Sequence, residues 1–149
     1  MNNDFRLKLL KEAAGCIDRA YAPYSRFEVG AALLSSSGRV FTGVNVESQV
    51  YGLTICAERV ALVKAISEGV LEFRAVAVVA RIIQERDNKS RFVKCWPCGA
   101  CLQMLSEFAL SLTDFEVITG VPGDETLLDV EIKRLNDLLP HAFRLKFRS

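Results

Sequence analysis

Hydrophobic residues recur along the first part of this chain with two different periods. Across residues 4–20 they return about every 3.6 positions, which predicts an amphipathic helix with one face on a core. Two apolar runs rich in β-forming residues follow at 27–34 and 39–46, separated by the polar turn Ser35-Ser36-Ser37-Gly38. Such a turn between two such runs is typical of a β-hairpin.

The middle of the chain alternates apolar strands with helical patterns. Residues 74–83 contain a nearly continuous apolar run, which indicates a central strand covered on both faces. Helices are predicted at 56–69, where Gly69 suits the C-terminal cap, and at 98–108. The polar and charged stretch 84–94 has no apolar period and predicts a solvated loop.

The last third of the chain continues this alternation. It predicts a strand at 115–119, a turn at 121–124, a strand at 126–130 and a short helix at 132–139, ended by Pro140. Strand-to-helix units that follow a hairpin predict an α/β sandwich with a mixed sheet. Because right-handed crossovers place helix N-termini on one side, the two longer helices should begin at the same sheet edge.

Composition narrows the function classes. The chain has 149 residues, half of them hydrophobic and a quarter charged, which suits a single domain over 1–149. A net charge of +1 gives no electrostatic reason to expect nucleic acid. The N-terminus has no signal-peptide pattern and no stretch approaches ~18 uninterrupted apolar residues, so we expect a cytoplasmic protein without a membrane partner. Five cysteines, an odd number, argue against a disulfide framework.

Three of the cysteines have the spacing of metal ligands. Cys98 and Cys101 lie three residues apart, on one face of a helical turn, and Cys56 begins the other helix. Free N–H groups and the helix dipole stabilise thiolates at these positions. Soft sulfur ligands select zinc, and three protein ligands leave the fourth position to water, as in catalytic sites. The sequence therefore predicts one Zn²⁺ per chain held by these three residues.

Two charged residues follow Cys56 closely. Glu58 is near enough to contact a metal-bound water without being a ligand, as a general base must be. Three thiolates outweigh the charge of Zn²⁺, and Arg59 could offset this excess by donating to one of them. The single histidine, His141, follows a helix stop near the C-terminus and is expected at the surface.

These residues resemble those of a known family. Cys56-Ala57-Glu58-Arg59 with Pro97-Cys98-Gly99-Ala100-Cys101 is similar to the pattern of the zinc-dependent cytidine deaminases, in their small homotetrameric, three-cysteine form. The likeness covers roughly residues 21–108 and returns at 138–143. It includes Tyr21-Ala22-Pro23-Tyr24-Ser25-Arg26-Phe27, Val29-Gly30-Ala31-Ala32-Leu33, Gly43-Val44-Asn45-Val46-Glu47 and Tyr51-Gly52.

The resemblance implies a fold and a reaction. The fold is a three-layer sandwich with a mixed five-stranded sheet. The reaction is hydrolytic deamination of cytidine, 2′-deoxycytidine or both to the uracil nucleoside, with release of ammonia, in pyrimidine salvage. Glu58 would move a proton from water to N3 of the base and then to the departing amine.

The resemblance also assigns substrate contacts. Asn45 and Glu47 would hold the ribose 3′-hydroxyl, and Phe27 would lie against the pyrimidine. Backbone groups of Ala57 would contact the base edge, and Phe143 would cover the site of a neighbouring subunit. From the residues alone, Phe27 and Phe143 could equally belong to a core, and Asn45 and Glu47 could simply end a strand.

Two departures from the family leave other interpretations open. Leu102 stands where relatives often carry arginine, and Cys95-Trp96 precedes Pro97 in place of a small polar residue. Cys95-Trp96-Pro97-Cys98 also fits a redox Cys-x-x-Cys motif, which leaves Cys56 and Glu58 unused. Further alternatives are a non-catalytic zinc module with a fourth protein ligand, and a deaminase for another substrate, such as an aminoacyl-nucleoside antibiotic.

Overall fold

The computed structural model describes residues 1–84, 89–122 and 127–145. The strands in these residues are β1 (Phe27–Ser35), β2 (Val40–Val44), β3 (Phe73–Ile83), β4 (Ser90–Val93), β5 (Glu116–Pro122) and β6 (Leu127–Arg134). The helices are α1 (Asn3–Cys16), α2 (Ala57–Ser67), α3 (Gly99–Phe108) and α4 (Leu135–Leu138), with short 3₁₀ turns at Ile17–Arg19 and Tyr51–Leu53.

The strands form one mixed sheet, as the sequence predicts. Five of them follow the order β2-β1-β3-β5-β6, and β4 pairs with β3 beside that path. β3 and β5 are parallel, whereas the other pairs are antiparallel. The α/β prediction is confirmed, with β4 as a sixth strand beyond the five expected.

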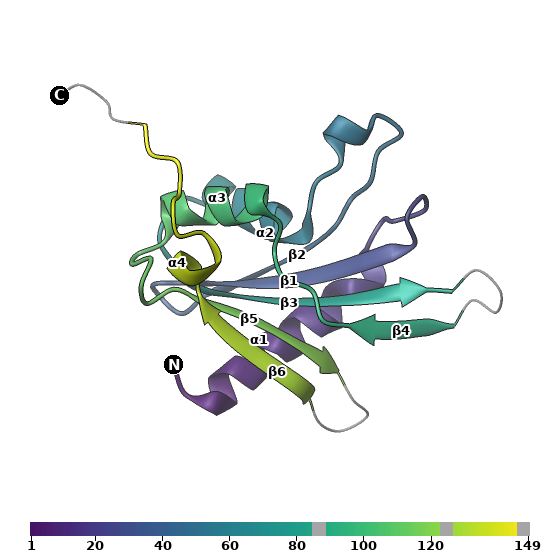
Figure 1. Cartoon of the computed structure of the whole chain (residues 1–149), viewed down its shortest axis with the longest axis horizontal. Coiled ribbons are helices and arrows are strands. Elements are labelled where there is room, and N and C mark those ends of the chain that lie inside the picture. Colours follow the sequence, from purple (N-terminus) through teal and green to yellow (C-terminus); the bar gives the residue numbers. More distant parts are fainter. Residues whose placement is uncertain (85–88, 123–126, 146–149) are drawn as a thin grey trace.

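Alternate residues of β3 face two separate cores. Ala75, Ala77 and Val79 pack with the apolar face of α1, whereas Val76, Val78 and Ala80 pack with α2 and α3. Strand side chains alternate in this way because successive Cβ atoms point to opposite faces. The result is three layers, with α1 below the sheet and α2 and α3 above it (Figure 1).

The helix that carries Cys56 packs unusually close to the sheet. A Cβ atom on Gly43 of β2 would lie 2.3 Å from the carbonyl oxygen of Ala57 and 2.4 Å from the nitrogen of Ala61. Only glycine permits this approach, because no side chain atom fits at such distances. Gly43 therefore fixes the first turn of α2, and with it the N-terminal position of Cys56.

Two predicted segments differ from the structure. The loop predicted at 84–94 contains β4, whose four residues include only two apolar side chains, Phe92 and Val93, too few to set an apolar period. The helix predicted at 132–139 is only Leu135–Leu138, since β6 extends through Ile132, which pairs with Ile118. Thr126 of the predicted strand and Gly123-Asp124 of the predicted turn lie outside the described residues.

No helix in the described parts of the chain combines the length and apolarity that crossing a bilayer requires.

Candidate metal centre and active site

The three predicted cysteine ligands meet at the N-termini of α2 and α3. Cys56 is the N-cap of α2, Cys98 is the N-cap of α3, and Cys101 lies buried in the first turn of α3. Their sulfur atoms all lie within 4.8 Å of one another, and those of Cys98 and Cys101 are 3.5 Å apart. The expected convergence of both helices on one sheet edge accounts for this cluster.

The cluster stabilises negative charge on sulfur. A hydrogen bond with the Cys101 thiol, together with the Arg59 guanidinium, lowers the pKa of Cys56 to about 5, although burial opposes this shift. The same hydrogen bond and burial raise the pKa of Cys101. Neither N-cap side chain makes a capping hydrogen bond, so both thiols are free to bind a metal.

This donor set fits zinc. Sulfurs on one tetrahedral zinc, each at about 2.3 Å from the metal, lie about 3.8 Å apart, which is close to the separations found here. Thiolates are soft ligands, so hard cations such as Mg²⁺ and Ca²⁺ are disfavoured. His141 is exposed and stands outside the cluster of metal-binding groups found in the described residues. A fourth protein ligand, as the structural zinc module requires, is therefore not found in that part of the chain.

Glu58 lies beside the cysteines, in the first turn of α2, with only 4% of its surface exposed. Burial raises its pKa to about 7, and the negative charge of Cys56 adds to this shift. A carboxyl group with a pKa near neutrality exchanges protons readily, as a general acid and base must. The position and the environment of Glu58 thus suit proton transfer at the metal centre.

Arg59 contacts the ligands directly. Its Nη2 atom lies 3.7 Å from Sγ of Cys56 and donates to the Thr54 carbonyl at 3.3 Å. Its Nε atom is buried without a hydrogen-bond partner among the described residues. Leu102 packs in the hydrophobic core with residues of α2 and α3. This apolar side chain supplies no positive charge to the thiolates.

Asn45 and Glu47 organise the loops beside the site. The Asn45 side chain accepts from the Val29 amide and donates to the Phe27 carbonyl, each at 2.8 Å. Glu47 accepts from the amides of Tyr24 and Ser25 and from the Ser25 hydroxyl. Burial opposes ionisation of Glu47, but these hydrogen bonds hold its pKa below the ordinary value.

The same segment is tied to the metal centre through the backbone. Val46 pairs with Tyr21 on one side and with Ile55, next to Cys56, on the other. Phe27 is half-buried at the start of β1 and packs against the core below α2 and α3, and Ala57 is fully buried. Backbone pairing thus joins the segment of Asn45 and Glu47 to the residue before Cys56, although both side chains also have internal partners.

Cys95 does not behave as a redox thiol. Burial, with the nearby charges of Glu58, Cys56 and Cys98, raises its pKa to about 11. Reactive cysteines of Cys-x-x-Cys motifs have lowered pKa values, so this environment disfavours the redox alternative. Trp96 packs against the core, and the Lys133 ammonium lies 5.8 Å from its ring centroid.

The structure reveals one residue that the sequence reasoning missed. Gln103, on α3, donates to the Phe143 carbonyl and accepts from the Phe143 amide, both at 2.9 Å. Arg144 adds a bond to the Ser106 carbonyl at 2.9 Å. The C-terminal segment is thereby held on α3 while the Phe143 side chain is 69% exposed. Forty positions separate Gln103 from Phe143, so no local pattern could have indicated this pair.

Thiol ligands at two converging helix N-termini, with a buried glutamate next to one of them, define a zinc-dependent deaminase. A family model described as the cytidine and deoxycytidylate deaminase zinc-binding region matches residues 4–115. The chain belongs to the cytidine deaminase family, and it is accordingly a hydrolytic deaminase with zinc as its cofactor.

Individual relatives agree with this assignment. A probable cytidine deaminase of Dictyostelium discoideum is 46% identical over 143 residues, which cover 96% of this chain and 86% of that protein. A cytidine deaminase of Halalkalibacterium halodurans is 45% identical over 93% of both chains. The crystal structure of cytidine deaminase from Burkholderia pseudomallei matches with a TM-score of 0.74 and 39% identity, covering 96% of this chain and all of that one.

Proposed function

We propose that this enzyme converts cytidine, 2′-deoxycytidine or both to the uracil nucleoside and ammonia. The observation that carries the proposal is the burial of Glu58 against the three clustered sulfurs. The names of the relatives, which are 45–46% identical over nearly the whole chain, point to the same substrate.

Glu58 provides the proton transfers. Held by Cys56, Cys98 and Cys101, zinc would supply Lewis-acid activation of the attacking water. The Glu58 carboxylate takes one proton from that water and delivers it to N3 of the base. It then takes the remaining proton from the hydroxyl now on C4 and transfers it to the amine there, so that the C4–N bond breaks, ammonia leaves and the C4 carbonyl forms. Arg59, whose Nη2 atom lies 3.7 Å from Sγ of Cys56, offsets part of the negative charge on that sulfur.

The loops around α2 orient the substrate. Phe27 lies against the pyrimidine ring, and backbone groups of Ala57 bind its edge. Glu47 and Asn45 hold the ribose 3′-hydroxyl, and this requirement favours a free nucleoside. The low pKa of Glu47 supports this role, because an ionised carboxylate is a strong hydrogen-bond acceptor.

The active form is a homotetramer in which Phe143 covers the site of a neighbouring subunit. Support comes from apolar side chains exposed beside the metal centre: Val50 is 63% exposed, Tyr51 82% and Leu53 70%. Exposed apolar groups gathered on one segment mark interaction surfaces. That segment, drawn with the 3₁₀ turn Tyr51–Leu53, projects away from the sheet in Figure 1.

The chain acts as one catalytic domain over 1–149, in the cytoplasm, and serves pyrimidine salvage by returning the cytosine nucleosides to the uracil pool. Neither nucleic acid nor a membrane is required as a partner in this scheme. The near-neutral net charge of +1 supports a small nucleoside rather than a polynucleotide.

The direct test is ammonia release from cytidine, 2′-deoxycytidine and cytosine, with zinc counted per chain in the same preparation. We expect release from one or both nucleosides, much less from cytosine, which lacks the ribose, and one zinc per chain. A protein that holds one zinc per chain and releases no ammonia from either nucleoside would overturn the proposal.

A further inference from the structure

A cavity of about 530 Å³ opens at the end of the sheet opposite the cysteines. The first turns of α1, the β1–β2 turn and the starts of β3 and β5 surround it. The metal centre, by contrast, lies at the N-termini of α2 and α3, and none of its residues lines the cavity. The cavity thus has no part in the site described above, and its volume is typical of small-molecule sites.

Cations outnumber carboxylates around this cavity. Arg74 and Arg134 line it, and Arg6 lies directly behind Glu116. With the amino group of Met1, these three guanidinium groups make four cations. The carboxylates are two, those of Asp114 and Glu116. The excess of positive charge favours an anionic ligand.

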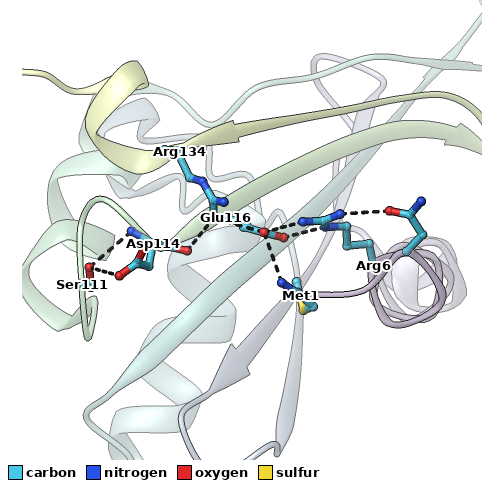
Figure 2. A network of polar contacts seen from close by, with 7 residues as sticks. Met1, Arg6, Ser111, Asp114, Glu116 and Arg134 are labelled. Atoms are coloured by element: carbon cyan, nitrogen blue, oxygen red, sulfur yellow. Dashed lines mark hydrogen bonds and ion pairs between the residues drawn. The ribbon is translucent and has the colours of Figure 1, made fainter.

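Glu116 offsets only part of the positive charge at the cavity, because Arg6, Arg134 and the Met1 amino group share this one carboxylate. Its carboxylate is 2% exposed and is bound by Arg6 through two hydrogen bonds of 2.8 and 2.6 Å. The Met1 amino group lies 3.6 Å away, and Nη1 of Arg134 lies 3.1 Å away (Figure 2). Two further nitrogens of Arg134, Nε and Nη2, make no hydrogen bond with the described residues. Glu116 thus holds this arginine in place and leaves donors available.

Arg74 is the second available donor. It is exposed at the start of β3 and forms no hydrogen bond or ion pair with any residue in the described part of the chain. A guanidinium group offers planar, bidentate hydrogen bonding to phosphate or carboxylate groups. Apolar side chains complete the wall, namely Phe5, Leu34, Leu110 and Phe115.

We propose that this cavity binds a small organic anion, with its phosphate or carboxylate group on Arg74 and Arg134 and its apolar or planar body against Leu34 and Leu110. The ligand class follows from the lining, which combines guanidinium donors with apolar side chains. The cavity is a second small-molecule site, separate from the metal centre.

The test uses the zinc-loaded full chain at low salt, titrated with adenosine 5′-monophosphate, benzoate or adenosine. Binding is followed by calorimetry and by the methyl NMR signals of Leu34, Leu110 and Leu53, the last of which lies in the 3₁₀ turn before Cys56, outside the cavity lining. We expect at least one of the two anions to bind and to shift the Leu34 and Leu110 signals but not the Leu53 signals. The anion that binds more tightly identifies the recognised group as phosphate or carboxylate. Adenosine should bind at least about tenfold more weakly than its monophosphate if phosphate is recognised.

Arg74→Gln should weaken binding of the anion about tenfold without unfolding the protein, since Arg74 has no partner among the described residues. Arg91→Gln, which removes an exposed arginine from β4, is the matched control and should bind normally. Leu110→Glu should abolish binding by placing a carboxylate at the cavity. The proposal is overturned if neither anion binds, if Arg74→Gln binds as well as the Arg91→Gln control, or if only the Leu53 signals shift.

Discussion

The two ends of this sheet each bury a glutamate, and the two carboxyl groups are held in opposite ways. Glu58 is 4% exposed and has a pKa raised to about 7 by burial and by the charge of Cys56. Glu116 is 2% exposed, yet the hydrogen bonds from Arg6 hold its pKa below the ordinary value despite burial. Solvent reaches almost none of either side chain, but Glu58 lies deeper among protein atoms, so depth of burial and the choice of partners both contribute to the opposite pKa shifts.

This difference distinguishes a carboxyl group that can act in catalysis from one that stabilises the fold. Glu116 is paired with cations from α1 and β6 and joins those elements to β5. Glu58 has thiols beside it and can change its protonation state at neutral pH. A buried carboxyl group with cationic partners stabilises the fold, whereas one without them is available for catalysis. The predictions below test this division, beginning with the largest effect.

Replacing Cys98 should abolish zinc binding and leave the ion pairs of Glu116 unchanged. Cys98→Ala leaves two sulfur ligands, so zinc content should fall from one per chain to nearly zero, and deamination should fall at least about a thousandfold. Zinc analysis of purified protein measures this. Cys95→Ala, which removes a thiol outside the cluster, should retain zinc; if it loses as much zinc as Cys98→Ala, the ligand assignment is wrong.

Neutralising Glu116 should lower the stability of the fold rather than the activity. Glu116→Gln leaves Arg6 partly buried without its counterion, which should lower the free energy of unfolding by about 3 kcal/mol. Urea unfolding measures the change, and zinc content and kcat at 25 °C should stay near wild type. Glu68→Gln, which breaks the exposed pair with Arg39, is the control and should cost under about 1 kcal/mol. Equal losses in the two variants would contradict the special role given to Glu116.

Acid should remove the contribution of Glu116. Because its folded pKa is lowered, its ionised form stabilises the protein above the unfolded pKa of about 4.3, and this stabilisation disappears as pH falls through the folded pKa. The difference in unfolding free energy between wild type and Glu116→Gln should therefore be constant near pH 7 and should shrink below about pH 4.3. A difference that instead grows on acidification would reverse the assigned sign.

The smallest effect concerns the C-terminal segment. Gln103→Leu removes both bonds to the Phe143 backbone, so the aromatic ring should lose its fixed position. Because we propose that this ring covers the substrate in a neighbouring subunit, KM should rise about fivefold with kcat little changed. Hydrogen exchange at the Phe143 amide should also accelerate. Gln84→Leu makes the same change at an exposed glutamine that does not contact Phe143, and should leave KM and exchange unchanged. An unaltered KM in Gln103→Leu would remove Gln103 from the site.

The metal centre could be predicted from the sequence because its geometry is local. Cys98 and Cys101 share one helical turn, and Cys56 with Glu58 share another. Only the meeting of the two helices needed a long-range argument, and the crossover rule for strand-to-helix units supplied it. The apolar run of β3 likewise indicated a strand buried on both faces.

The Glu116 network and the Gln103 pair could not be predicted. Arg6 and Glu116 are 110 positions apart, and a charged residue in a sequence usually indicates a solvated surface. β4 was missed because it is only four residues long: Phe92 and Val93 pack on the two cores, but two apolar residues set no period. Contacts made by single long-range pairs, or by the main chain, leave no period in the sequence.

The most direct measurement is ammonia release from cytidine by Glu58→Gln, compared with Glu116→Gln in the same assay. The amide at position 58 cannot carry the proton, so its kcat should fall about a thousandfold with one zinc still bound per chain, whereas Glu116→Gln should keep nearly full kcat. If Glu58→Gln with zinc bound deaminates cytidine at the wild-type rate, Glu58 is not the proton carrier and the division between the two ends is wrong.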